Sequence, residues 1–150
     1  MVTILLIMED DIRPSTLAVN VLTKLCRIIP TWKIIHSHER IDAAYKDPEV
    51  RQEIRSNPYC YKGSLRLLTC NQPIKFGLDL EQRLEEVSIP FLLVHGEEDE
   101  VRYPSVSNLL FESASSKDKS FKLYRWMWHS LTYGELPENI DTVFEDVTSW

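Results

Sequence analysis

The sequence predicts an α/β fold, with a short parallel sheet of about three strands flanked by helices. Apolar runs at residues 2–8, 89–96 and 120–125 are the predicted strands. The first two are continuously apolar, which is typical of strands buried on both faces of a parallel sheet. The runs at 89–96 and 120–125 are each followed by a loop and a helical pattern that begins with a proline, Pro104 or Pro137. This repeat predicts a wound sheet whose ligands lie beyond the carboxyl ends of its strands.

A long insertion, residues 9–88, separates the first predicted strand from the second. Ser15 and Asp47 are predicted to cap two helices, of which the second ends before Pro58, and residues 79–87 predict a further short helix. An insertion of this length between two strands is commonly a lid or cap over a functional site. A packed helical subdomain without a gating role is the alternative. We treat residues 1–150 as a single partial domain with this insertion inside it.

Two residues are expected to interrupt a helix within the insertion. Pro73 and Gly77 lie where a helix over residues 65–84 would otherwise run. In a helix interior, proline is less favourable than alanine by about 3 kcal/mol and glycine by about 1 kcal/mol. The sequence therefore predicts a break in this stretch.

Composition excludes several classes of partner. The 150 residues suit one domain, and 17 basic against 23 acidic residues leave a net charge of -6 without a Lys/Arg cluster. Nucleic acid and anionic membranes are therefore not expected to be principal partners. The apolar run at 2–8 is too short to cross a bilayer and does not resemble a signal peptide.

The cysteines and histidines predict neither a metal site nor a disulfide framework. Three cysteines, Cys26, Cys60 and Cys70, lack paired spacing and favour a reducing compartment, which we expect to be the cytoplasm. His36 and His38 lack further ligands nearby. We expect no cofactor and no metal.

Asp99 and His129 are the candidate catalytic residues. Asp99 directly follows the second predicted strand and His129 follows the third, so the two side chains are expected to meet across neighbouring loops. A carboxylate beside an imidazole is the arrangement of an oriented general base. The alternatives are an aspartate that caps its own turn and a histidine that packs on Trp126 and Trp128.

Several stretches resemble a known family. The motifs "NPYCYKG" and "MWHSLTYGE", with "DPEVRQEIRS" and "IPFLLVHGEEDE", are similar to the second half of plant monoacylglycerol lipase and caffeoylshikimate esterase type α/β-hydrolases. The resemblance implies a serine hydrolase of carboxylic esters that needs no cofactor. It implies that Asp99 and His129 are the aspartate and histidine of a Ser-Asp-His triad, and that the insertion is a mobile cap that shapes an acyl pocket.

The nucleophile of that family is not in this sequence. None of the four glycines flanks a serine in a G-x-S-x-G elbow, and the family's glycine-rich oxyanion loop is also missing. Ser64, Ser130 and Cys60 lack the setting that activates a nucleophile. We therefore expect no turnover by these residues alone, as for a truncated gene product or a degenerate homologue.

The turns around the two candidate residues depart from the family pattern. Glu98 stands where the family has a small residue, and Arg102-Tyr103 replaces a Thr-Asp pair. Glu98 should raise the pKa of Asp99 and Arg102 should lower it, so the sequence leaves the net shift open. Arg125-Trp126 replaces a Pro-Gly turn that leads to the histidine, which changes how that turn is formed.

Three interpretations follow from these observations. The chain is a catalytically incomplete hydrolase, or part of a longer complete enzyme, or a non-catalytic interaction protein that uses the exposed edge of its first strand. The expected partners are a lipid or acyl-ester small molecule if a second half complements the chain, a membrane surface bound weakly, and a second copy joined through the first strand.

Overall fold

The centre of the fold is a parallel pair of strands. The computed structural model describes residues 15–35, 39–61 and 63–150. Within these ranges, β3 (Phe91–Gly96) and β4 (Lys119–Tyr124) pair in parallel, residue for residue along their whole lengths. The strands predicted at 89–96 and 120–125 are thus confirmed, with ends shifted by one or two residues. β3 starts after Pro90, whose nitrogen carries no hydrogen for a ladder.

Other sequence-based expectations fall beyond this part of the chain. The predicted first strand at residues 2–8, and with it the proposed exposed edge, lies outside the described residues. His36 and His38 lie outside them as well.

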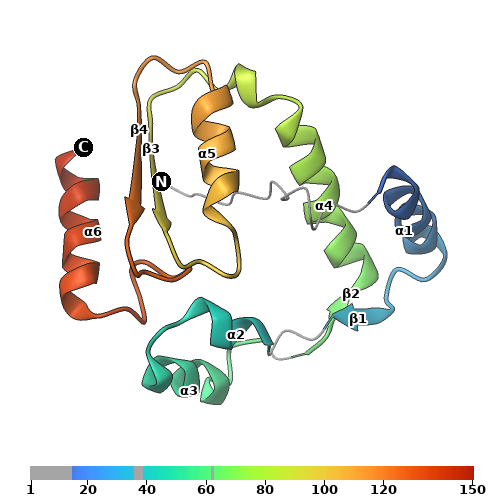
Figure 1. The fold of residues 1–150 in the computed structure, drawn as a ribbon. Helices are drawn as coiled ribbons and strands as arrows, with labels where there is room; N and C mark the ends of the chain where they lie inside the picture. The colour runs from blue at the N-terminus through green and yellow to red at the C-terminus, as the bar shows by residue number, and fades with distance from the viewer. Residues whose placement is uncertain (1–14, 36–38, 62) are drawn as a thin grey trace.

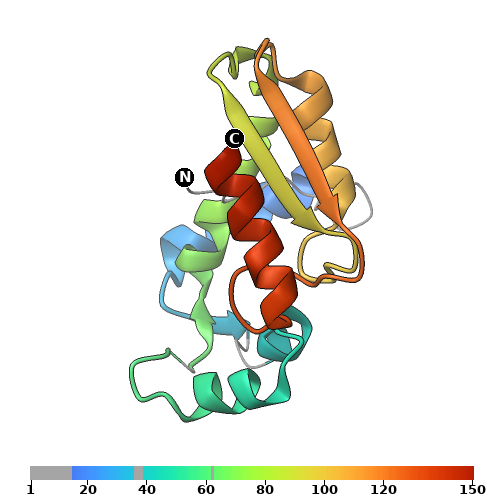
Figure 2. The ribbon, with the colours of Figure 1, turned by 90° about the vertical axis from the view of Figure 1, so that its left-hand side faces the viewer.

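One helix covers each face of the strand pair. α5 (Pro104–Ser113) and α6 (Pro137–Ser149) both have their proline in the first turn, as predicted. Figures 1 and 2 show these two helices on opposite faces of β3 and β4. The predicted α/β layering is therefore present.

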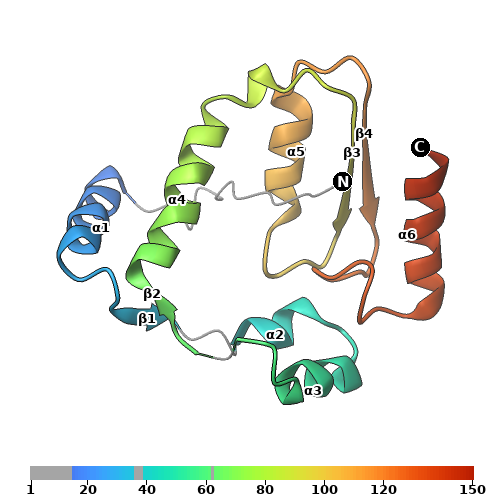
Figure 3. The ribbon, with the colours of Figure 1, turned by 180° about the vertical axis from the view of Figure 1, so that it is seen from behind.

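The remaining elements lie within residues 9–88, the stretch that the sequence predicts to be an insertion. α1 (Thr16–Ile28) packs against α4 (Leu67–Glu81), and β1 (Lys33–Ile35) forms an antiparallel pair with β2 (Leu65–Arg66). α2 (Glu39–Ala44) and α3 (Pro48–Ser56) lie beyond the carboxyl ends of β3 and β4 (Figure 3). The insertion thus places α2 and α3 at the sheet edge where ligands are expected. The β1–β2 pair and α2 were not predicted.

The predicted helix caps are confirmed. The hydroxyl of Ser15 accepts a hydrogen bond from the backbone N–H of Ala18 at 3.2 Å, and α1 follows. The carboxylate of Asp47 accepts one from the N–H of Glu49 at 2.8 Å, and α3 starts at the next residue after the cap. Each cap accepts a hydrogen bond from a backbone N–H group that has no carbonyl partner within the helix.

The predicted break at Pro73 and Gly77 is wrong. α4 continues through both residues to Glu81. One side of this helix is buried, and its contacts with α1 include a bond from Thr23 Oγ1 to Asn71 Oδ1 of 3.4 Å. Burial of a helix face against a neighbour offsets an unfavourable intrinsic propensity.

The predicted extent of the helix at residues 79–87 is also wrong. Its first three residues belong to α4, and a short 3-10 helix, η1 (Leu84–Glu86), follows after a turn. Leu84 is buried against Val106 of α5, with Leu80 and Leu110 around them. The turn brings both Leu80 and Leu84 to this cluster.

No helix in the described ranges is long and apolar enough to cross a membrane.

Candidate functional site

The loops that follow β3 and β4 are joined to each other by backbone hydrogen bonds. The N–H of Glu97 donates to the carbonyl of Tyr124 at 2.9 Å, and the N–H of Glu98 donates to that of Met127 at 3.0 Å. A Cβ at Gly96 would lie only 2.3 Å from the carbonyl oxygen of Trp128. The second loop therefore crosses directly over Gly96, where a side chain would not fit, and reaches Asp99.

This crossing brings the two predicted residues together. His129 Nδ1 lies 2.8 Å from Asp99 Oδ2. Asp99 is buried, with 4% of its surface exposed, whereas the His129 side chain is 40% exposed. Among the described residues, the His129 ring forms a hydrogen bond to Asp99 alone. The bond uses Nδ1, so Nε2 is the nitrogen that can exchange a proton with a substrate or a nucleophile.

Asp99 also caps its own turn. Its Oδ1 accepts hydrogen bonds from the backbone N–H groups of Val101 and Arg102, both at 2.8 Å. The sequence left open whether Asp99 caps its own turn or contacts His129, and the structure shows that it does both. The other alternative was a histidine that packs on Trp126 and Trp128, and to this the structure adds the hydrogen bond from the ring to a buried carboxylate.

A second histidine, His95 on β3, contacts the same carboxylate. His95 Nε2 lies 2.8 Å from the carbonyl oxygen of Arg102 and 3.1 Å from Asp99 Oδ2, and Nδ1 lies 2.6 Å from Ser107 Oγ. A carbonyl and a carboxylate only accept hydrogen bonds, so Nε2 of His95 carries a proton that faces both of these acceptors.

The serine, histidine and aspartate just described do not form a second catalytic triad. Ser107 is 1% exposed, so no ester can reach its hydroxyl. The arrangement instead places a second imidazole ring on Oδ2 of Asp99, the oxygen that His129 also contacts. Sequence reasoning missed His95 and Ser107. The available signal was that His95 precedes Asp99 by four residues at the end of a predicted strand.

The net effect on the pKa of Asp99 is now clear. Burial acts to raise it, but hydrogen bonds from His129, His95 and the backbone N–H of Arg102 outweigh burial and hold the pKa of Asp99 well below its usual range. Arg102 lowers the pKa of Asp99 through its backbone N–H, whereas the expectation from the sequence rested on the charge of its side chain. An ionised Asp99 accepts the Nδ1 proton of His129 and so orients its ring.

The turn that leads to His129 contains a strained residue. Trp126 has a φ of 64° and is the only non-glycine with positive φ among the described residues. A residue with a Cβ is disfavoured in this left-handed region. In the family that the sequence resembles, glycine stands at this position. The turn therefore keeps a backbone conformation that favours glycine, although its residue is a tryptophan.

Relatives of known activity match this chain along nearly its whole length. Caffeoylshikimate esterase of Arabidopsis thaliana is 34% identical over 97% of this chain and 44% of that protein. Monoacylglycerol lipase of Mycolicibacterium smegmatis is 31% identical over 95% of this chain and 48% of that protein. The chain spans about half the length of these relatives.

Solved structures agree on the fold. A soluble variant of the monoglyceride lipase of Saccharomyces cerevisiae superposes with a TM-score of 0.78 at 20% identity, over 97% of this chain and 52% of that one. A monoacylglycerol lipase of Paleococcus ferrophilus gives a TM-score of 0.70 at 18% identity. The predicted partial α/β-hydrolase fold is confirmed.

The family itself is shown by a further match. The family model Hydrolase_4, described as serine aminopeptidase, S33, matches residues 5–136. The resemblance to ester-hydrolysing relatives is confirmed by the two proteins above. Because the match covers most of its residues, the chain belongs to the Hydrolase_4 family of α/β-hydrolases.

Proposed function

We propose that this chain supplies the aspartate and histidine of a serine hydrolase that cleaves carboxylic esters. The observation that carries the proposal is the 2.8 Å contact between His129 Nδ1 and the buried, ionised carboxylate of Asp99. It leaves Nε2 of a half-exposed ring as the base. Membership of the Hydrolase_4 family and the names of the relatives support an ester as the substrate.

The chemistry of the pair follows from its geometry. Nε2 of His129 takes the hydroxyl proton of a serine while the serine oxygen bonds to the ester carbonyl carbon. It then gives that proton to the leaving alcohol as the ester C–O bond breaks, which leaves an acyl-serine. Water attacks the acyl-serine by the same route, and the acid is released. Asp99 stabilises the imidazolium that forms in each step.

The serine and the oxyanion donors must come from outside these 150 residues, because the sequence has no G-x-S-x-G elbow. We therefore propose a half-site that is inactive alone and active with a polypeptide that carries both elements. The substrate class is proposed as monoacylglycerols, lysophospholipids or related acyl esters. The relatives named for monoacylglycerol and caffeoylshikimate esters support this range.

Residues 9–88 are proposed as the cap of this site. The support is the position of α2 and α3 beyond the carboxyl ends of β3 and β4 (Figure 1). That is the edge at which Asp99 and His129 lie.

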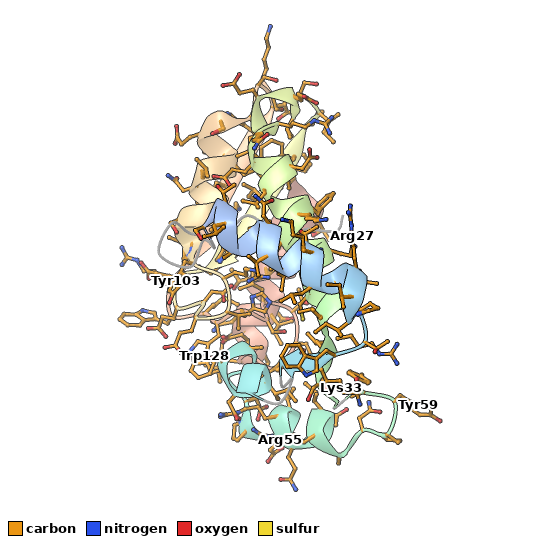
Figure 4. The ribbon with its side chains drawn as sticks, turned by 90° about the vertical axis from the view of Figure 1, so that its right-hand side faces the viewer. Arg27, Lys33, Arg55, Tyr59, Tyr103 and Trp128 are labelled. Carbon is orange, nitrogen blue, oxygen red and sulfur yellow. The ribbon has the colours of Figure 1, made fainter. Side chains whose placement is uncertain are left out.

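Weak binding to a lipid surface is part of the proposal. The support is a group of exposed apolar side chains on and after α1, namely Leu17, Val21, Ile28, Ile29 and Trp32. Arg27 of α1 and Lys33 of β1, labelled in Figure 4, belong to the same stretch of chain. An open depression there is lined by Ile29, Thr31, Trp32 and Lys33. Apolar side chains with neighbouring cations suit an interfacial contact. We place the chain in the cytoplasm, in line with the free thiols of Cys26 and Cys60.

Complementation tests the proposal. The 150-residue chain is mixed with a separately produced amino-terminal half of a relative, which carries the elbow serine, and hydrolysis of a monoacylglycerol and of an aryl ester is measured. We expect hydrolysis and fluorophosphonate labelling only in the mixture, and neither with His129→Ala or with the elbow serine changed to alanine. A covalent adduct on the 150-residue chain alone that requires His129 would contradict the proposal.

A further inference from the structure

We propose that Glu135 is a positioning residue for His129 and that it acts with Lys46 of the insertion. We call residues 126–135 the histidine loop and residues 39–56, which contain α2 and α3, the α2–α3 segment. The inference rests on the proposed function, because it assigns a role to residues around the base of that site.

Glu135 is a buried carboxylate that closes the histidine loop. Its side chain has no exposed surface. Its Oε1 accepts the backbone N–H of Trp128 at 2.8 Å, and its Oε2 accepts Asn139 Nδ2 at 3.2 Å. Trp128 directly precedes His129. The carboxylate at one end of the loop therefore fixes the peptide between Met127 and Trp128, one residue before the histidine.

Lys46 connects this carboxylate to the strained turn. Its Nζ lies 3.9 Å from Glu135 Oε2 and donates a hydrogen bond of 2.6 Å to the carbonyl of Trp126. A buried carboxylate needs compensation for its lost hydration, and a lysine at this distance contributes to it. The same ammonium group holds the carbonyl of the residue with left-handed backbone. One lysine thus attaches to the loop at two points, one before and one after His129.

Backbone bonds fasten the α2–α3 segment to the histidine loop at two points after His129. The N–H of Ser130 donates to the carbonyl of Ala44 at 3.1 Å. The N–H of Asp47 donates to the carbonyl of Gly134 at 3.0 Å. Lys46 is thus held against the loop by main-chain contacts of its neighbours.

Side chains complete the attachment. The hydroxyl of Tyr133 donates to Glu53 Oε2 at 2.8 Å, and its ring meets Tyr45 edge to face with centroids 6.1 Å apart. Gly134 has a φ of 78°, and a Cβ there would lie 3.0 Å from the ring of Tyr45. The loop and the segment fit closely, so a shift of one displaces the other.

The position of the His129 ring therefore depends on its backbone as well as on Asp99. Since the ring is half exposed and bonds to one carboxylate, the peptide at Trp128 sets the direction from which it approaches Asp99. Removing the carboxylate of Glu135 leaves the Trp128 N–H without its acceptor and Lys46 without its anion. We expect the loop to loosen while β3, β4 and their helices stay folded.

NMR spectroscopy of the 150-residue chain tests this without relying on activity. Two signals are followed: amide hydrogen exchange at Trp128, and the His129 Nδ1 proton, which a bond to a carboxylate shifts downfield. In Glu135→Ala we expect Trp128 exchange to rise at least about tenfold and the Nδ1 signal to be lost, as for loss of a hydrogen bond to a charged group. In Glu135→Gln, whose amide oxygen can still accept the Trp128 N–H, exchange should return to near the wild-type rate.

Two lysine variants separate a local role from a general loss of charge pairing. Lys46→Met should speed exchange at Trp128 and shift the His129 signal. The matched control is Lys122→Met, which removes an ion pair with Asp146 away from the loop and should leave both signals unchanged. If Glu135→Ala does not fold, Lys46→Met decides the matter. Wild-type signals in Lys46→Met, or equal changes in Lys122→Met, would overturn the proposal.

Activity of the complemented protein provides a separate readout. With the elbow-bearing half present, Glu135→Ala should lower kcat and leave KM nearly unchanged. If the wild-type mixture is inactive, the proposed function fails while the NMR result on the loop still stands. If the wild-type mixture is active and Glu135→Ala matches it in kcat, the positioning role fails and the proposed function stands.

Discussion

At the scale of single residues, the carboxylate of Asp99 couples the site to pH. Four donors converge on its two oxygens: the N–H groups of Val101 and Arg102, and the rings of His95 and His129. The pKa of Asp99 is lower in the folded protein than in an unfolded chain, so folding favours the ionised carboxylate. The resulting stability is fully present above about pH 4 and is lost as the pH falls toward the lowered folded pKa.

Asp99→Asn should remove this contribution. A neutral amide cannot replace a carboxylate that accepts from four donors, so we expect the free energy of unfolding at pH 7 to fall by about 1.5–3 kcal/mol. The difference between variant and wild type should begin to narrow below about pH 4, as the wild-type contribution declines toward the lowered folded pKa of Asp99. Urea unfolding at pH 7 and at pH 3 measures both values. A difference that stays constant over this range would refute the assigned cause.

Trp126 offers a stabilising change. Its side chain is 68% exposed, so little burial is lost when it is removed. Trp126→Gly removes the strain of a left-handed residue, about 1–3 kcal/mol, against the greater unfolded-state freedom of glycine, about 0.4–1 kcal/mol. We expect a net gain in unfolding free energy of about 1 kcal/mol in urea titrations.

Trp126→Ala is the control for that gain. Alanine keeps a Cβ in the left-handed region and so keeps the strain, while it removes the same indole ring. A gain in Trp126→Ala equal to that in Trp126→Gly would show that the ring, rather than the backbone, is responsible.

At the scale of elements, helix starts were predictable and helix continuity was not. Ser15, Asp47, Pro104 and Pro137 act within one turn of their own position, so local sequence suffices to place them. The passage of α4 through Pro73 depends on contacts with α1, about fifty residues away in sequence. The short β1–β2 pair likewise depends on two segments meeting, which no local pattern indicates.

Pro73 is therefore expected to weaken α4 where it stands. Pro73→Ala restores a donor for the helix ladder and removes a steric conflict, so the free energy of unfolding should rise by about 1–3 kcal/mol. Urea unfolding followed by far-UV circular dichroism measures it. A loss of stability would mean that the packing of α4 on α1 needs the proline's local geometry.

Gly96 joins the two site loops and should not tolerate a side chain. A Cβ there would lie 2.3 Å and 2.4 Å from the carbonyl oxygens of Trp128 and Met127, which are backbone atoms. We expect Gly96→Ala to destabilise the fold by at least about 2 kcal/mol and to abolish the downfield His129 signal. Leu123→Ala, at an exposed position on β4, is the control and should keep that signal.

At the scale of the whole molecule, the site was predicted in part. The pairing of Asp99 with His129 followed from one strand-helix-strand spacing, because parallel strands bring their following loops to one edge. His95 and Ser107 were not predicted, since their contacts require the register between a strand end and the interior of α5. The contacts of α2 and α3 with the histidine loop also depend on three-dimensional packing of distant segments.

The described residues leave many large apolar side chains exposed, among them Trp32, Leu68, Phe76, Phe144 and Trp150. Apolar surface of this extent usually meets a partner or lipid. We expect the elbow-bearing half to raise the Tm of the 150-residue chain in a concentration-dependent way, because a ligand that binds only the folded state stabilises it. Differential scanning fluorimetry at increasing ratios measures the shift. An unchanged Tm at every ratio would count against association of the halves.

The attachment of α2 and α3 to the histidine loop has a consequence for how this fold can change in evolution. Residues 44–47 and 126–135 share main-chain bonds, so neither can be replaced without a matching surface on the other. Exchange of the proposed cap segment between relatives, by recombination or by design, should succeed only when the histidine loop is exchanged together with residues 39–56. Substrate preference and the placement of the base would then be inherited together as one unit.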